Sequence, residues 1–251
     1  MVKKKKEKIK LKPKAKLGKG KIGEKPKAKK GKKLDKRIEI LDKLREEPRT
    51  KLKEEELQEL ISPRRAIDLK IQRHLEDLPL HFTALLLVEP TDYSRTNVEL
   101  VRLFIDAAEK RGIYVTLNKS FQYLSEVLKI EGIDVSNIQF VDGITRGTGR
   151  EELKAENCMY TESPNDLVAL SMVLEEAYKK VEEQPAFLIF DSVSTLLIYN
   201  TDAAVERFIH SMIGKLREWK MKGIILMVKS EEQRGLIDVI SQFCDKTVEL
   251  T

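Results

Sequence analysis

The sequence AFLIF at residues 186–190 places an unbroken apolar run directly ahead of Asp191. Apolar residues at both alternating positions indicate a strand that is covered on both faces, which is typical of a parallel sheet with helices on each side. In such sheets ligands bind beyond the carboxyl ends of the strands, where Asp191, Ser192 and Ser194 would lie. From this stretch alone, Asp191 is equally well interpreted as a cap of the next segment or as part of a ligand site.

Apolar runs alternate with amphipathic segments from about residue 81 onward. Strands are expected at 84–88, 113–117, 138–144, 157–161, 186–190, 224–228 and 247–250. Helices are expected at 96–111, 121–130, 165–181, 201–220 and 233–243, with a polar loop at 145–156. Gly112 and Gly223 are interpreted as helix C-caps. Because right-handed crossovers place helices on both faces, this alternation predicts an α/β fold with a mostly parallel sheet.

The chain before residue 81 has a different character. Residues 1–33 are mostly Lys, Gly, Pro and Ala, with little to bury, and are expected to form a disordered tail. Residues 34–80 are expected to form a helical segment, with apolar stripes at Leu34, Ile38, Leu41 and Leu44 and at Ile67, Ile71, Leu75 and Leu78. These helices could bind a partner or self-associate, although packing on the α/β domain at 81–251 is the simpler expectation.

Composition restricts the class of protein further. No apolar run approaches the ~20 residues that a membrane-spanning helix needs, so no membrane span is expected. The two cysteines, Cys158 and Cys244, make neither a disulfide framework nor a metal site, which favours a reducing, cytoplasmic location.

Charge is divided unevenly along the chain. Residues 1–33 hold 17 Lys against two Glu, a balance of +15, so the remainder carries −9 of the total of +6. Any non-specific attraction to nucleic acid is therefore expected to reside in the lysine-rich tail, although the tail could serve only to keep the protein soluble.

The order of elements, together with FLIFDSVSTLL at 187–197 and FCDKTVEL at 243–250, resembles the KaiC-like branch of the RecA superfamily of P-loop ATPases. GIYVTL at 112–117 and IQFVDGI at 138–144 resemble the family's second and third strands, and FCDKTVEL its closing hairpin. The match covers about residues 82–251. The resemblance implies a three-layer RecA-like P-loop fold in which Asp191 is the Walker B aspartate, which helps to hold the magnesium of bound ATP.

The turn after the first strand departs from this family. A P-loop requires G-x-x-x-x-G-K-[ST], whereas residues 89–96 read EPTDYSRT. Aligned on the hydroxyl, Thr96 is kept and Arg95 replaces lysine, but Glu89, Asp92 and Ser94 stand where the family has glycine. Carboxylates and Cβ atoms both oppose the usual phosphate cradle.

A second departure follows the second strand, where active relatives carry a glutamate that activates the attacking water. This chain has Asn118 and Lys119 there, and neither is a suitable general base at neutral pH. We therefore expect the hydrolytic machinery to be absent.

The leading expectation is a KaiC/RecA-like module that has lost ATP hydrolysis and acts in regulation or assembly, with an unknown protein partner or by self-association. Magnesium–ATP would be bound weakly or not at all, through Ser94, Arg95, Thr96 and Asp191, with Thr96 and Asp191 as the metal-binding pair. One alternative is a divergent but active ATPase with Arg95 in place of the lysine. Another is a nucleic-acid-associated accessory protein in recombination or repair, since relatives act in recombination and the tail is basic.

Overall fold

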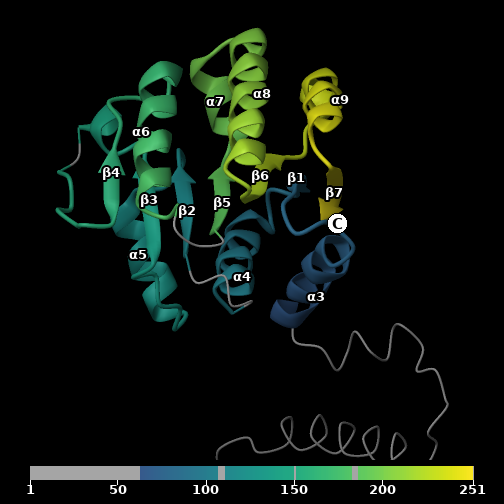
Figure 1. Ribbon diagram of the computed structural model, residues 1–251, viewed down its shortest axis with the longest axis horizontal. Coiled ribbons are helices and arrows are strands. Elements are labelled where there is room, and N and C mark those ends of the chain that lie inside the picture. Colours follow the sequence, from purple (N-terminus) through teal and green to yellow (C-terminus); the bar gives the residue numbers. More distant parts are fainter. Residues whose placement is uncertain (1–62, 107–110, 150, 183–185, 251) are drawn as a thin grey trace, which may run out of the picture. The chain divides into compact units, whose positions relative to one another are not determined.

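The structure is a computed structural model that describes residues 63–106, 111–149, 151–182 and 186–250, all within one compact unit (Figure 1). Its strands are β1 (Thr83–Val88), β2 (Arg111–Thr116), β3 (Ile138–Asp142), β4 (Cys158–Tyr160), β5 (Ala186–Asp191), β6 (Lys222–Val228) and β7 (Lys246–Leu250). Its helices are α3 (Pro63–Leu75), α4 (Tyr93–Asp106), α5 (Phe121–Ile130), α6 (Leu167–Lys179), α7 (Val193–Tyr199), α8 (Asp202–Glu218) and α9 (Arg234–Phe243), with 3-10 turns η1 (Arg146–Thr148) and η2 (Glu231–Gln233). The expected tail at 1–33 and the part of the expected helical segment at 34–62 lie outside the described residues.

The strands form one sheet in the order β4-β3-β2-β5-β6-β1-β7, and every neighbouring pair within it is parallel. β5 lies in the middle, between β2 and β6, and each of its six residues is buried. The prediction of a mostly parallel α/β sheet is therefore confirmed. The carboxyl ends of all strands meet at one edge, so Asp191 is placed beside the ends of β2 and β6.

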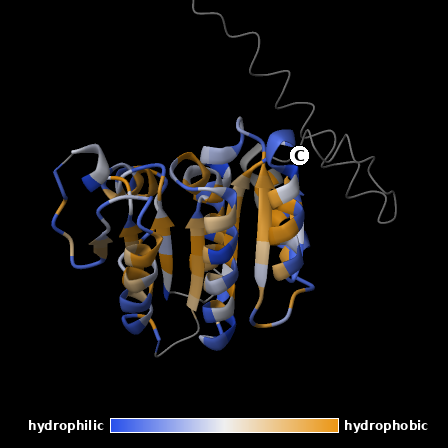
Figure 2. Cartoon of the chain, turned by 90° about the horizontal axis from the view of Figure 1, so that it is seen from above, coloured by the Kyte–Doolittle hydropathy of each residue, from blue (hydrophilic) through white to orange (hydrophobic). Residues whose placement is uncertain are grey.

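Helices cover both faces of the sheet, so that the domain has three layers. Along β5 the side chains alternate between two apolar clusters, with Leu188 and Phe190 in one and Phe187 and Ile189 in the other. The first cluster is completed by α6, α7, α8 and α9, and the second by α3, α4 and α5. Figure 2 shows the apolar strands between helices whose outer faces are hydrophilic. Burial on both faces explains why AFLIF has no polar residue at either alternating position.

Two departures from the predicted elements matter for the site. α4 begins at Tyr93, three residues before the expected start at Thr96, which leaves only Glu89–Asp92 for the turn after β1. A short helix, α7, follows β5 directly and was not expected. The closing strand expected at 247–250 is confirmed as β7, which pairs in parallel with β1.

The interpretation of Gly112 and Gly223 as helix C-caps is wrong. Both lie inside strands, Gly112 in β2 and Gly223 in β6. A Cβ atom on Gly112 would come within 2.3 Å of the Phe187 ring, and one on Gly223 within 2.7 Å of Leu216. These glycines are therefore required by close packing against the sheet and not by a turn at the end of a helix.

The helix α3 packs on the α/β domain, in agreement with the simpler expectation for that helix. Ile71 is 1% exposed within the same apolar cluster as α4, and Lys246 Nζ donates to the carbonyl oxygen of His74 at 2.7 Å. Within the part of the chain that the structure describes, no helix is long and apolar enough to cross a membrane.

Candidate functional site

Asp191, the last residue of β5, is completely buried at the carboxyl edge of the sheet. Its Oδ1 accepts a hydrogen bond from the Tyr93 hydroxyl. Its Oδ2 accepts one from Asn97 Nδ2 at 2.8 Å and one from the Tyr114 hydroxyl at 2.8 Å. We call these four residues the Asp191 cluster. Both carboxylate oxygens are thus engaged by protein donors.

Three elements bring the Asp191 cluster together. Tyr93 and Asn97 are one turn apart on α4 and so lie on the same face of that helix, toward the sheet. Tyr114 lies on β2, where it is paired with Ile189 of β5. None of the three donors is more than 6% exposed. The cluster therefore joins the start of α4 to the middle of the sheet through polar contacts inside an apolar layer.

Burial also changes the protonation of this cluster. Loss of hydration raises the pKa of Asp191 above its ordinary value, while hydrogen bonds from Tyr93 and Tyr114 and the charge of Lys119 oppose that rise. Burial, followed by the nearby Asp191 charge, raises the pKa values of Tyr93 and Tyr114 as well. Both tyrosines therefore remain protonated at neutral pH and keep their hydrogen-bond donors.

The turn between β1 and α4 is closed by its own backbone and by ion pairs. The N–H of Asp92 donates to the Glu89 carbonyl at 3.0 Å, and the N–H of Thr96 donates to the Asp92 carbonyl at 2.8 Å. The Glu89 carboxylate lies 3.7 Å from Lys229, which also pairs with Glu249 at 2.9 Å. The amide of Thr96, at the position of the last P-loop residue, is thus used within the helix.

One residue from each of the two stretches that depart from the family pattern contacts the other. Lys119, after β2, donates from Nζ to Ser94 Oγ on α4 at 2.8 Å, and the same ammonium lies 5.3 Å from the centre of the Tyr123 ring. The cavity beside them is only about 50 Å³ and is lined mostly by apolar side chains of α4 and α5. Such a space is large enough for a water molecule and far smaller than a nucleotide.

The remaining candidates from the sequence are placed as follows. The backbone N–H of Val228 donates to Ser194 Oγ at 2.9 Å, so Ser194 joins α7 to β6. Ser192 is buried, and its hydroxyl lies 3.2 Å from that of Thr195. Arg95 is half-buried, and its guanidinium makes no hydrogen bond or ion pair within the described residues. The Asp191 carboxylate thus accepts hydrogen bonds from Tyr93 and Asn97 of α4 and from neither Ser94, Arg95 nor Thr96.

Sequence reasoning missed Tyr93, Asn97 and Tyr114 as partners of Asp191. Tyr93 lies within the aligned motif and Asn97 directly follows it, and their i, i+4 spacing on a helix was a usable signal. It also missed Asp142 at the end of β3, which is fully buried. Asp142 accepts from the backbone N–H groups of Phe121, Ile144 and Thr145 at 2.7–2.9 Å and from the Thr145 hydroxyl at 2.6 Å. These bonds give Asp142 a structural role in the turn after β3.

Magnesium–ATP does not fit the residues as they lie. Thr96 Oγ1 is buried without a hydrogen-bond partner and would be free to face a ligand, as would Asn97 Oδ1. However, Asp191 is 0% exposed, and both of its carboxylate oxygens already accept hydrogen bonds from protein side chains. Among the described residues no group of three His, Cys, Asp or Glu side chains could hold a metal ion.

A protein-family profile matches residues 83–250, which is most of the chain. This is the family described as DUF7504, a family of unknown function. The chain belongs to DUF7504. The matched range runs from the first residue of β1 to the last residue of β7, so the family comprises the whole sheet. No curated protein matches this member of DUF7504.

Three of the solved structures that are similar to this DUF7504 chain come from the archaeon Pyrococcus horikoshii. An uncharacterized protein, PH0321, solved in complex with an unknown peptide, has a TM-score of 0.56 at 12% identity over 72% of this chain and 82% of its own. The KaiC-like protein PH0186 has a TM-score of 0.53 at 12% identity over 72% and 77%. A third protein, PH0250, has a TM-score of 0.50 at 12% identity over 73% and 87%. The DUF7504 chain therefore has the RecA-like fold of KaiC-like proteins.

Proposed function

We propose that this DUF7504 chain is a KaiC/RecA-like module that does not hydrolyse ATP and works in regulation or assembly through contacts with protein. The observation that carries the proposal is that the Asp191 carboxylate is buried and accepts hydrogen bonds on both of its oxygens. A Walker B aspartate must present its carboxylate to hydrated magnesium, and here that carboxylate is enclosed by Tyr93, Asn97 and Tyr114. Freeing it would cost the hydrogen bonds of the cluster and leave buried donors without partners, at about 1–3 kcal/mol for each unpaired group.

The surroundings support the same conclusion. Backbone N–H groups that cradle phosphate in a P-loop are here partly used inside the turn and the first turn of α4. Glu89 and Asp92 would add negative charge beside a triphosphate. Lys119, in the position of the relatives' water-activating glutamate, is a cation that is bonded to Ser94. A protonated lysine cannot accept a proton from water, so general-base catalysis has no group at this position.

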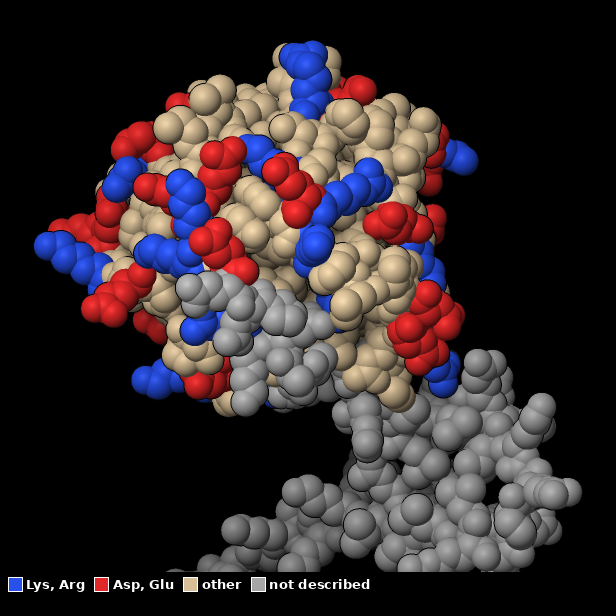
Figure 3. Space-filling model, in the orientation of Figure 1, with Lys and Arg blue, Asp and Glu red and all other residues tan. Residues whose placement is uncertain are grey.

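A protein or peptide is a more suitable ligand for this domain than a nucleotide or a nucleic acid. PH0321, which shares the fold, was solved with a peptide, and this supports a peptide or protein ligand for the DUF7504 chain without identifying it. Acidic and basic side chains are interspersed on the face of the domain that Figure 3 shows, so this face offers no continuous basic surface for nucleic acid. Any contact with nucleic acid is assigned to the lysine-rich residues 1–33.

The test is titration of the full-length chain with magnesium–ATP by calorimetry, combined with an ATP turnover assay. The control is Asp191→Asn, which keeps the shape of the side chain but cannot support a Walker B role. We expect no binding heat and no turnover above that of the Asp191→Asn protein. A magnesium-dependent binding heat, or a turnover that disappears in the control, would overturn the proposal and favour the divergent ATPase.

A further inference from the structure

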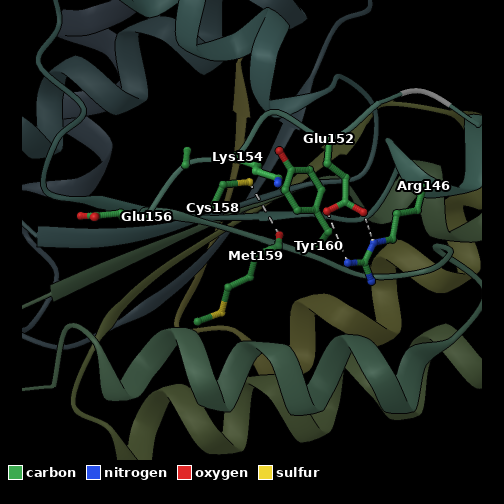
Figure 4. Close-up of a pocket in the computed structure, with 8 residues that line it drawn as sticks. Arg146, Glu152, Lys154, Glu156, Cys158, Met159 and Tyr160 are labelled. Atoms are coloured by element: carbon green, nitrogen blue, oxygen red, sulfur yellow. Dashed lines mark hydrogen bonds and ion pairs between the residues drawn. The ribbon is translucent and has the colours of Figure 1, made fainter.

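β4 forms one end of the sheet and lies beside a hollow of about 560 Å³ (Figure 4). The hollow lies between this strand and the loop at 152–156, and Arg146 of η1 completes the lining. All three residues of β4 are half-buried, whereas every residue of β3 beside it is buried. β3 and β2 separate β4 from β5, so the hollow is distinct from the Asp191 cluster. Its volume lies in the range of about 300–1,000 Å³ that ligand pockets occupy.

One side of β4 is used for pairing with β3. The carbonyl of Asn157 accepts from the N–H of Phe140 at 2.7 Å, and the N–H of Thr161 donates to the Asp142 carbonyl at 3.0 Å. Along a parallel strand the backbone groups of successive residues point to opposite sides. Since these odd-numbered residues face β3, the backbone groups of the even-numbered residues of β4 face away from it.

Most of these outward backbone groups are unpaired. The N–H of Cys158 donates to the Ala155 carbonyl at 3.3 Å. The Tyr160 N–H and the carbonyls of Cys158 and Tyr160 have no backbone partner within the described ranges. An open strand edge of this kind can pair with the main chain of a further strand, largely independently of its side chains. The ligand that fits this edge is therefore an extended polypeptide.

Side-chain contacts hold the loop as the second wall of the hollow. The Tyr160 hydroxyl donates to the Leu153 carbonyl at 2.8 Å. Arg146 pairs with Glu152 at 2.6 Å and with Glu162 at 2.7 Å, and its guanidinium lies 5.9 Å from the centre of the Tyr160 ring. Figure 4 shows Arg146 and Glu152 facing each other beside Tyr160. Specific contacts therefore hold the loop beside the open edge of the sheet.

β4 and the loop before it carry an excess of negative charge. Residues 151–162 contain four Glu against one Lys, a balance of −3, and all four glutamates are exposed. Arg146, the other cation of the lining, is already engaged by two of these carboxylates. Glu151 and Glu156 have no ion pair within the described residues, and Figure 4 shows Glu156 at the opposite end of the strand from Arg146. A basic ligand would give these two carboxylates partners, whereas an acidic ligand would be repelled.

We propose that the outer edge of β4 binds an extended segment of another protein that carries lysine or arginine, and that this segment adds to the sheet as a further strand. Backbone hydrogen bonds to Cys158 and Tyr160 provide affinity, and the basic side chains pair with Glu151 and Glu156. The three residues of β4 span about 10 Å at about 3.3 Å each, so the paired part of the ligand is short. A second copy of this chain is disfavoured, because it would bring two acidic edges together.

The β4 edge thereby supplies a site for the contacts with protein in the proposed function, on which this inference rests. The two can still fail separately, because the edge takes no part in the Asp191 cluster and peptide binding is measured without nucleotide. Failure of peptide binding would leave the expected absence of ATP turnover in place. Detection of ATP turnover would overturn the proposed function and leave the result of peptide binding in place.

The test is binding of a fluorescein-labelled peptide of alternating lysine and valine, KVKVKVK, to the full-length protein, measured by fluorescence anisotropy. The peptide EVEVEVE is the control for charge and should bind more weakly. Glu151→Lys combined with Glu156→Lys should weaken binding of KVKVKVK about tenfold or more, because two attractive contacts become repulsive. Lys154→Glu should tighten binding, since it removes a like charge from the lining.

A matched control makes the same charge change away from β4. Glu218→Lys combined with Glu232→Lys alters exposed residues of α8 and η2, outside the lining of the hollow. Because salt screens exposed charges beyond about 10 Å, this control should keep the affinity for KVKVKVK within about twofold. Equal weakening by both double variants would assign the effect to net charge and overturn the inference.

Two variants of Tyr160 test the backbone contact. Tyr160→Pro removes the outward N–H without removing a hydrogen bond to β3, and proline is tolerated at such edge positions. Tyr160→Val is the control, because it lacks the same ring and hydroxyl but keeps the N–H. We expect the proline variant to bind KVKVKVK about threefold to tenfold more weakly than the valine variant. Thermal unfolding checks that both variants fold.

Hydrogen exchange at the Tyr160 amide of the unmodified protein gives a test that needs no variant. Exchange should be fast in the protein alone and should slow about tenfold or more when KVKVKVK is bound, because the amide then donates to the peptide. Unchanged exchange on binding, or no binding up to about 1 mM peptide, would overturn the inference. Slow exchange before peptide is added would overturn it too, and loss of that protection on dilution would identify a second copy of the chain as the occupant.

Discussion

The hydroxyl of Tyr93 donates a hydrogen bond to the carboxylate of Asp191, although 98 residues separate them in the sequence. Tyr93 occupies the aligned P-loop stretch, and Asp191 occupies the aligned Walker B position. The contact therefore joins the two positions that the sequence resemblance assigns to phosphate and to magnesium. Asp191 is thus part of the packed interior, and several consequences of this burial can be measured.

Asp191→Asn should alter how stability depends on pH. The folded-state pKa of Asp191 is raised. Its favourable contribution to the free energy of unfolding is therefore fully present below the unfolded-state pKa and is lost as the pH rises through the folded-state pKa. Asparagine does not ionise. We therefore expect the melting temperature of the variant, relative to the unmodified protein, to rise steadily from acidic to neutral pH. A constant difference across that range would show that Asp191 does not titrate as inferred.

Tyr93→Phe should destabilise the protein by about 1–3 kcal/mol, because it leaves a buried carboxylate oxygen without its donor. Urea unfolding measures the change. Tyr123→Phe is the matched control, since Tyr123 is 51% exposed and its change should stay within about 0.5 kcal/mol. In the Asp191→Asn background the cost of Tyr93→Phe should fall. Equal costs in both backgrounds would argue against coupling between the two side chains.

Restoring the P-loop consensus alone should not restore nucleotide binding. The sequence alignment suggests that Glu89→Gly, Asp92→Gly, Ser94→Gly and Arg95→Lys would suffice. Because Tyr93 would still engage Asp191, we expect this fourfold variant to give no binding heat with magnesium–ATP. Adding Tyr93→Ala should produce binding that Asp191→Ala then removes.

Circular dichroism of both P-loop variants would confirm that they fold. Binding by the fourfold variant with Tyr93 intact would refute the role of this side chain in closing the site.

Gly112→Ala should be strongly destabilising, by about 2 kcal/mol or more, because the new Cβ would lie 2.3 Å from the buried Phe187 ring. Gly214→Ala is the natural comparison. Gly214 lies within α8, and no described atom outside that helix lies within 4 Å of the position that a Cβ atom would take. Alanine there should stabilise by about 0.5–1 kcal/mol through helix propensity. Thermal unfolding of the two variants should shift in opposite directions, and a shift in the same direction would contradict the role of packing at Gly112.

Deleting residues 1–33 should abolish retention of the protein on DNA while leaving the unfolding temperature of the domain nearly unchanged. The deleted residues carry +15 and no aromatic residue, so binding must come from lysine contacts and counterion release and not from base stacking. Each neutralised phosphate should add about 0.9 to the slope of log affinity against log salt on duplex DNA. A truncated protein with a similar slope would place the site on the acidic domain instead.

The sequence by itself determined the layered parallel sheet and the position of Asp191 at the end of its central strand. Both follow from local information. Apolar residues at both alternating positions of a strand require helices to cover both faces of the sheet, and the polar residue that follows marks the end of the covered strand. The element order also carried the resemblance that the KaiC-like structures support. The sequence predicted the ends of helices less well, since α4 begins three residues earlier than its apolar pattern indicated.

Only the tertiary structure decided what Asp191 contacts. From the local sequence, Tyr114 is interpreted as an apolar strand residue and Tyr93 as a turn residue. No spacing rule relates Tyr114 to a residue 77 positions later, or Tyr93 to one 98 positions later. Gly112 was misinterpreted for the same reason, since the Phe187 ring that excludes a Cβ atom belongs to a neighbouring strand. Sequence patterns report which side of an element is buried, whereas the partner on that side is set by the packing of distant elements.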